Sequence, residues 1–118
     1  MGLVHDLQEA ADRIRDQKEV SIISHIDADG IASETILELA LQQEEIPVRP
    51  IFVRQIEPFA MRYVPRDSSF KIFTDLGAGQ QNLLEEHGLR ENEVLIVDHH
   101  VGRPASTSYP QVNALTYG

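Results

Sequence analysis

Residues 94–100 read Val94-Leu95-Ile96-Val97-Asp98-His99-His100, four apolar side chains followed by an acid and two histidines. A short apolar run of this kind is typical of a strand that is buried on both faces of a parallel sheet. The polar triplet follows at once, so we expect it where the strand leaves the core, a common position for a binding site. Adjacent histidines also occur as ordinary loop residues, and the rest of the chain has to decide between these interpretations.

Strand and helix patterns alternate along the chain. Apolar, β-branched runs predict four strands, at residues 20–24, 47–53, 70–74 and 93–97. Helical spacing of apolar side chains predicts helices at residues 3–18, 31–43 and 80–86, with a short one at 59–63. Gly30 is expected to form a tight turn before the second helix. The alternation predicts an α/β fold: a three-layer, doubly wound, mainly parallel sheet with helices on both faces.

Side chains that can bind metal ions follow three of the predicted strands. These seven residues are His25, Asp27, Asp29, Asp75, Asp98, His99 and His100. Right-handed crossovers place the carboxyl ends of parallel strands on one edge of the sheet, so we expect the seven side chains to meet in one crevice. The alternative is that each serves a turn or caps a helix. Acids and histidines, rather than Ser, Thr or Asn, recur at all three strand ends, which favours a site.

Carboxylates packed closely repel one another unless protons or cations neutralise them. The chain contains no cysteine, and oxygen and imidazole ligands suit Mn²⁺, with Mg²⁺ and Zn²⁺ as alternatives. Seven potential ligands exceed the needs of one ion and predict two ions about 3.5–4 Å apart, as in two-metal phosphoesterases. Asp75 stands alone at its strand end and is the predicted bridging ligand.

Composition narrows the classes of function without selecting one. The chain has 118 residues and a formal net charge of −9, which argues against binding nucleic acid through a basic surface. A nuclease remains open, because bound cations reverse the local field. Arg54, Arg62 and Arg66 form either a patch that faces phosphates or a solvated face. No apolar run approaches the ~18 residues of a membrane span and no signal-peptide pattern is present, so we expect a cytoplasmic protein without membrane contact.

Three motifs resemble those of the DHH phosphoesterases: residues 25–30 the first, Asp75 the second, and residues 98–100 the third. The resemblance implies a partial DHH domain and Mn²⁺-dependent hydrolysis of phosphodiesters or phosphoanhydrides. It implies that His25 and Asp27 bind one ion, that Asp29 and His99 bind the other, and that Asp75 bridges them. It also implies that His100 contacts substrate phosphate and that Asp98 orients the histidines. The implied catalytic residues are Asp75, His99 and His100.

Within this family, the first motif and residues 74–79 are most similar to the RecJ-like single-strand exonucleases, particularly the archaeal branch that associates with the replication factor GINS. This similarity implies single-stranded DNA or RNA as substrate, a role in DNA replication and repair or RNA turnover, and GINS as a partner. Relatives that share the motifs leave a second hypothesis open, a phosphohydrolase for oligonucleotides, nucleoside bisphosphates, cyclic dinucleotides or pyrophosphate. A third is a non-catalytic scaffold module of replication.

The printed sequence stops at Gly118, before the fourth motif and the DHH-associated substrate domain of the family. We therefore expect residues 1–118 to form the N-terminal part of a DHH phosphoesterase domain. On this expectation the 118 residues bind at most one Mn²⁺ tightly and have little hydrolytic activity. We also expect self-association through a sheet edge that truncation leaves unpaired.

Overall fold

A computed structural model describes residues 2–100 and 109–113. Its centre is a parallel sheet of five strands in the order β2-β1-β3-β4-β5. The strands are β1 (Val20–His25), β2 (Val48–Val53), β3 (Phe70–Thr74), β4 (Val94–Asp98) and β5 (Gln111–Asn113). The helices are α1 (Leu3–Arg15), α2 (Ala28–Gln43) and α3 (Gln81–Glu86), with 3₁₀ turns η1 (Ala60–Tyr63), η2 (Ala78–Gln80) and η3 (Glu91–Glu93). None of the helices in this described part is long and apolar enough to cross a bilayer.

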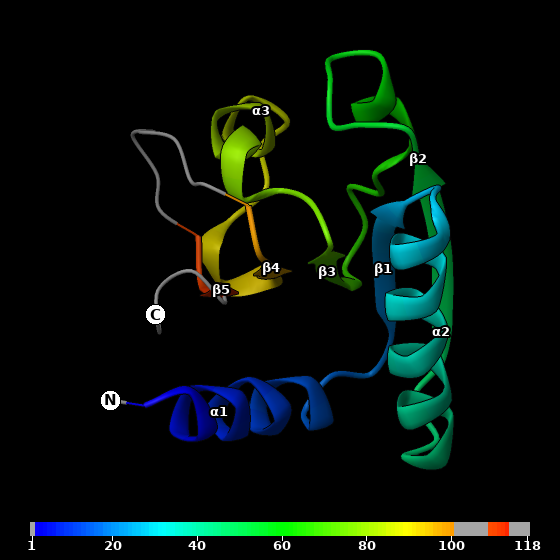
Figure 1. The fold of residues 1–118 in the computed structure, drawn as a ribbon, viewed down its shortest axis with the longest axis vertical. Coiled ribbons are helices and arrows are strands. Elements are labelled where there is room, and N and C mark those ends of the chain that lie inside the picture. The colour runs from blue at the N-terminus through cyan, green and yellow to red at the C-terminus, as the bar shows by residue number, and fades with distance from the viewer. Residues whose placement is uncertain (1, 101–108, 114–118) are drawn as a thin grey trace.

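Both faces of the sheet are covered, which confirms the doubly wound α/β prediction. Successive strand residues point to opposite faces, so neighbours along a strand enter different clusters. Ile22, Ile72 and Leu95 belong to a cluster completed by residues of α1 and α2. Ile23, Phe73 and Ile96 belong to the other cluster, with residues of α3 and of the segment around η1. In Figure 1, α1 and α3 accordingly lie on opposite sides of the β3-β4-β5 half of the sheet.

The predicted strands are all present, and β5 is an addition. It pairs with β4 in parallel, with Val97 opposite Val112 and Asp98 opposite Asn113. Three residues with one apolar side chain are too few to show strand periodicity, and the hydrogen bonds that define this strand come from β4. The edge beside β4, which we expected to be open, therefore carries a short strand. Self-association stays a prediction.

The second helix begins at Ala28, earlier than the predicted Ile31. Asp27 is its N-cap, and one carboxylate oxygen accepts a hydrogen bond from the Gly30 N–H at 2.8 Å. Gly30 therefore lies in the first helical turn, and our expectation of a turn glycine is wrong. Its role is close approach, because a Cβ there would lie 1.9 Å from the His25 carbonyl oxygen. The buried Ser24 hydroxyl also donates to the Gly30 carbonyl at 2.7 Å, which holds α2 against the end of β1.

Candidate metal centre

The carboxyl ends of β1, β3 and β4 surround a cavity of about 360 Å³. Six of the seven predicted residues line it: His25, Asp27, Asp29, Asp75, His99 and His100. The seventh, Asp98, lies beneath the cavity with its side chain fully buried. The parallel topology thus brings residues up to 75 positions apart in the sequence, His25 and His100, to one place.

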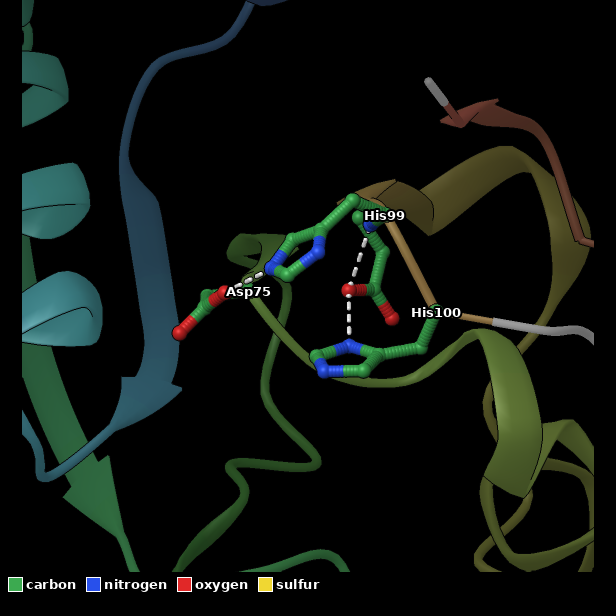
Figure 2. Close-up of side chains that lie close together, drawn as sticks. Asp75, His99 and His100 are labelled. Carbon is green, nitrogen blue, oxygen red and sulfur yellow. Dashed lines mark hydrogen bonds and ion pairs between the residues drawn. The ribbon is translucent and has the colours of Figure 1, made fainter. Parts of the chain in front are cut away.

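Asp75 occupies the first position after β3 and has a constrained backbone conformation. Its φ of +66° lies in the left-handed region, which aspartate tolerates better than most residues, and its backbone N–H donates to the Val97 carbonyl at 2.9 Å. Its carboxylate is almost buried, and Oδ1 lies 2.7 Å from His99 Nε2. Figure 2 shows the His99 ring pointing at this carboxylate. A left-handed residue held this way fixes the direction of its side chain.

Asp98 positions both histidines that follow it. Its Oδ1 accepts the backbone N–H of His99 at 2.7 Å and lies 2.6 Å from Nδ1 of His100. The other oxygen, Oδ2, accepts the backbone N–H of Ala78 at 3.1 Å, which ties β4 to the turn after β3. The two imidazole rings lie side by side, with centroids 4.3 Å apart (Figure 2). These contacts are those that an orienting residue makes.

Asn113 of β5 supports the same loop, since its side-chain amide donates to the His100 carbonyl at 2.8 Å. Sequence reasoning missed this residue because it missed β5. It also missed Gln55 and Ile56, which line the cavity after β2. These residues were missed because the end of β2 carries neither an acid nor a histidine. The position of β2 in a parallel sheet could have identified them, because its carboxyl end lies on the same edge as those of β1, β3 and β4.

On the β1 side, His25 and Asp27 contact each other. His25 Nδ1 lies 2.7 Å from Asp27 Oδ2, while Oδ1 holds the N-terminus of α2. The hydrogen bond from the Gly30 N–H, and then the contact with His25, lower the pKa of Asp27, so this carboxylate stays ionised at neutral pH. Asp29 lines the cavity from the first turn of α2.

Two groups of potential ligands meet at this cavity and share one residue. Asp75, Asp98, His99 and His100 offer ligand atoms that all lie within 4.8 Å of one another, and so do His25, Asp27 and Asp75. Imidazole and carboxylate donors without thiolates fit Mn²⁺. Across residues 2–100 and 109–113, no group of this kind includes Asp29, so its predicted place beside His99 stays a prediction.

Comparisons with known proteins identify the family and the fold of this chain. Residues 19–117 match the DHH family, N-terminal domain. No curated protein sequence matches the chain. Among solved structures, an exonuclease RecJ bound to manganese is similar with a TM-score of 0.74 and 20% identity, over 98% of this chain and 31% of that one. RecJ from Thermus thermophilus in complex with Mn²⁺ is similar with a TM-score of 0.64 and 25% identity, over 95% of this chain and 16% of that one.

The chain therefore spans less than a third of the length of the RecJ chains that it resembles. The structural similarity concerns the α/β sheet and its helices, which both comparisons cover almost completely. The match to the family extends over most of the chain and contains all three motifs. This protein belongs to the DHH family.

Proposed function

We propose that the protein takes part in Mn²⁺-dependent hydrolysis of phosphodiester bonds in single-stranded nucleic acid. The observation that carries this proposal is the position of Asp75, which belongs to both groups of potential ligands. A carboxylate shared by two sites is what a pair of adjacent ions needs. The family and the likeness to manganese-bound RecJ structures support the same reaction class.

In this proposal His25 and Asp27 would hold one ion, His99 and Asp29 would hold the other, and Asp75 would contribute to both sites. Bound Mn²⁺ would supply Lewis-acid stabilisation of the phosphoryl oxygens and a lowered pKa for the attacking water. Mg²⁺ is the alternative ion, because it accepts the same oxygen ligands.

The protein's own groups determine where the phosphate would lie. His100 turns Nδ1 toward the buried carboxylate of Asp98, which leaves Nε2 for a substrate phosphate oxygen. The same carboxylate fixes the backbone of His99. Asp98 is thus a positioning residue, and the orientation of two histidines depends on it.

A small-molecule phosphohydrolase is the second candidate function, and the small size of the cavity supports it. About 360 Å³ lies near the lower end of the range for small-ligand sites, so it accommodates a compact phosphate ester. A strand of nucleic acid would place one phosphate here and extend its bases over the neighbouring surface. The two candidates differ in how activity depends on substrate length.

The first prediction concerns Asp75→Asn, which keeps the shape of the side chain and removes its charge. We expect Mn²⁺ binding measured by titration calorimetry to weaken strongly, and hydrolysis of an oligonucleotide to fall more than about a hundredfold. Loss of a residue that merely supports a ligand already costs about 10–100-fold, and a shared ligand should cost more. The matched control is Asp12→Asn, an exposed acid on α1 outside the cavity.

Substrates with blocked 5′ or 3′ ends, compared with dinucleotides and nucleoside bisphosphates, separate the candidates. Turnover of long single strands supports the nuclease, and turnover restricted to the smallest substrates supports the phosphohydrolase. Full activity in Asp75→Asn would refute the shared-ligand assignment. Because we expect little activity of residues 1–118 alone, Mn²⁺ binding without turnover would favour a scaffold role only in a protein that also carries the fourth motif and the substrate domain.

A further inference from the structure

The segment between β2 and β3 exposes two aromatic rings and an arginine on one small surface. Phe59 is 57% exposed and Tyr63 is 60% exposed. Their rings meet edge to face with centroids 6.2 Å apart, and the Arg62 guanidinium carbon lies 5.0 Å from the centroid of the Phe59 ring. We call these three side chains the aromatic patch. Exposed apolar side chains that form a contiguous patch mark an interaction site more often than single exposed side chains do.

The aromatic patch stands on a rigid base. Three neighbouring residues in the same segment are buried: Ala60, Met61 and Val64. They belong to the cluster that contains the sheet residues Ile23 and Phe73. The backbone from Ala60 to Tyr63 is the 3₁₀ turn η1. Because the turn is packed against the core, the backbone that carries the exposed rings is ordered before any ligand arrives, which lowers the entropy lost on binding.

The aromatic patch lies beside the proposed metal centre. Ile56 lines the cavity of the candidate metal centre, which we call the metal cavity, and Phe59 follows three residues later. One residue spans at most about 3.6 Å, so the Cα atoms of these two residues are within about 11 Å of each other. Figure 1 shows the loop that carries η1 projecting beyond the carboxyl ends of β1 and β2. A polymer with one unit in the cavity can therefore place a neighbouring unit on the patch.

The charge of this segment differs in sign from that of the molecule. Residues 54–66 contain three arginines and one glutamate, a net +2, whereas the whole chain carries −9. The remainder then carries −11. A polyanion approaching this acidic protein is attracted to this segment and to cations in the cavity. Charge thus favours a strand of nucleic acid over a neutral or basic protein surface.

We propose that Phe59, Tyr63 and Arg62 form a stacking platform for the bases of a single strand whose scissile phosphate occupies the metal cavity. Aromatic rings with an adjacent arginine bind successive bases of single strands with little sequence preference. The inference rests on the proposed function and adds the surface that selects unpaired bases over small phosphate esters. Stacked or paired bases of a duplex cannot lie on such a platform.

The test measures binding of a fluorescein-labelled oligothymidylate and of an abasic oligonucleotide of equal length, by anisotropy with Ca²⁺ replacing Mn²⁺. The double variant Phe59→Leu/Tyr63→Leu keeps apolar side chains and loses the flat rings. We expect it to bind oligothymidylate about tenfold or more weakly, because stacking on each ring is lost. The abasic strand should bind both proteins equally. Ile36→Ala/Leu39→Ala removes exposed apolar side chains from α2 and serves as the control.

Hydrolysis gives a second measurement that separates this inference from the proposed function. The double variant should hydrolyse the abasic oligonucleotide, which has no flat rings, like the unmodified protein, while its KM for oligothymidylate rises. Equal weakening of the thymidylate and abasic strands, or no change in either, would overturn the platform and favour a protein partner there. The binding result decides the matter even if residues 1–118 hydrolyse no substrate, because we expect little activity of these residues alone. Loss of Mn²⁺ binding, with the thymidylate preference kept, would count against the proposed function alone.

Discussion

The two sides of the metal cavity are built in different ways. On the β3–β4 side, the side chains of Asp75 and Asp98 are 8% and 0% exposed, and both carboxylates accept hydrogen bonds or contact histidines. On the β1–α2 side, the side chains of His25 and Asp27 are 35% and 52% exposed and are held mainly by each other and by the end of α2. One side is fixed by buried groups. The other side depends on how α2 packs against the end of β1.

This difference follows from what each acid does in the fold. Asp98 ends a central strand and accepts hydrogen bonds from two backbone N–H groups, so the fold itself requires its carboxylate. Asp27 caps a helix at the surface, where water competes for the same role. We infer that the β3–β4 side keeps its geometry without a ligand, and that the β1–α2 side can adjust when ions bind.

A buried acid of α2, Glu34, differs from the acids at the cavity. The carboxylates of Asp27, Asp75 and Asp98 have hydrogen-bond partners on both sides of the site. Glu34 lies four residues, about one helical turn, after Gly30, is 2% exposed, and its Oε2 has no hydrogen-bond partner among the described residues. Burial, and then the neighbouring Glu38, raise the pKa of Glu34 to about 7. The helix that positions Asp27 and Asp29 therefore contains a buried acid whose charge destabilises it.

Gly30→Ala should have the largest effect on stability and should affect the β1–α2 side alone. The new Cβ would lie 1.9 Å from the His25 carbonyl oxygen, which is backbone, so α2 must move away from β1. We expect a loss of about 3 kcal/mol in the free energy of unfolding, at the upper end for overpacking. Urea denaturation measures it. Gly2→Ala, where nothing lies within 4 Å, is the control, and an equal effect of both substitutions would contradict the docking argument.

Asp98→Ala tests the opposite side. It leaves the N–H groups of Ala78 and His99 without their carboxylate partner, and each loss of a buried partner costs about 1–3 kcal/mol. We expect about 2 kcal/mol of destabilisation in urea, together with weaker Mn²⁺ binding because both histidines lose their orientation. Asp29→Ala removes an exposed acid from the same cavity and should leave stability nearly unchanged. Unchanged Mn²⁺ affinity in a folded Asp98→Ala protein would exclude the orienting role.

Glu34→Gln should have an effect on stability that depends on pH and disappears at low pH. The folded protein holds the Glu34 proton with a pKa of about 7 and the unfolded chain with the ordinary value of 4.5. Between these values the folded state binds more protons, so this group stabilises the fold at low pH and loses that contribution as pH rises through 7. Glutamine stays neutral, and we expect the variant to be more stable by at most about 3 kcal/mol at pH 8 and equally stable at pH 4.

Melting temperatures measured across this pH range provide the check. Glu38→Gln removes the second cause of the shift while keeping burial, so it should show the same trend with a smaller amplitude. A gain for Glu34→Gln that is the same at both pH values would mean that the charge of Glu34 is not responsible.

The sequence alone determined four strands, the fold class and six of the residues that line the cavity. Apolar runs such as 94–97 identify buried strands, and in a parallel sheet the residue after each run must reach the same edge. That argument placed His25, Asp75 and His99 together without any distance information. Only the tertiary structure decided what depends on contacts between distant segments: β5 and Asn113, the true role of Gly30, the buried bonds of Asp98, and the exposed rings of Phe59 and Tyr63. The spacing of apolar residues along a chain indicates which side chains are buried. It does not indicate which distant segments approach each other or which groups form hydrogen bonds, because those segments meet only in the folded protein.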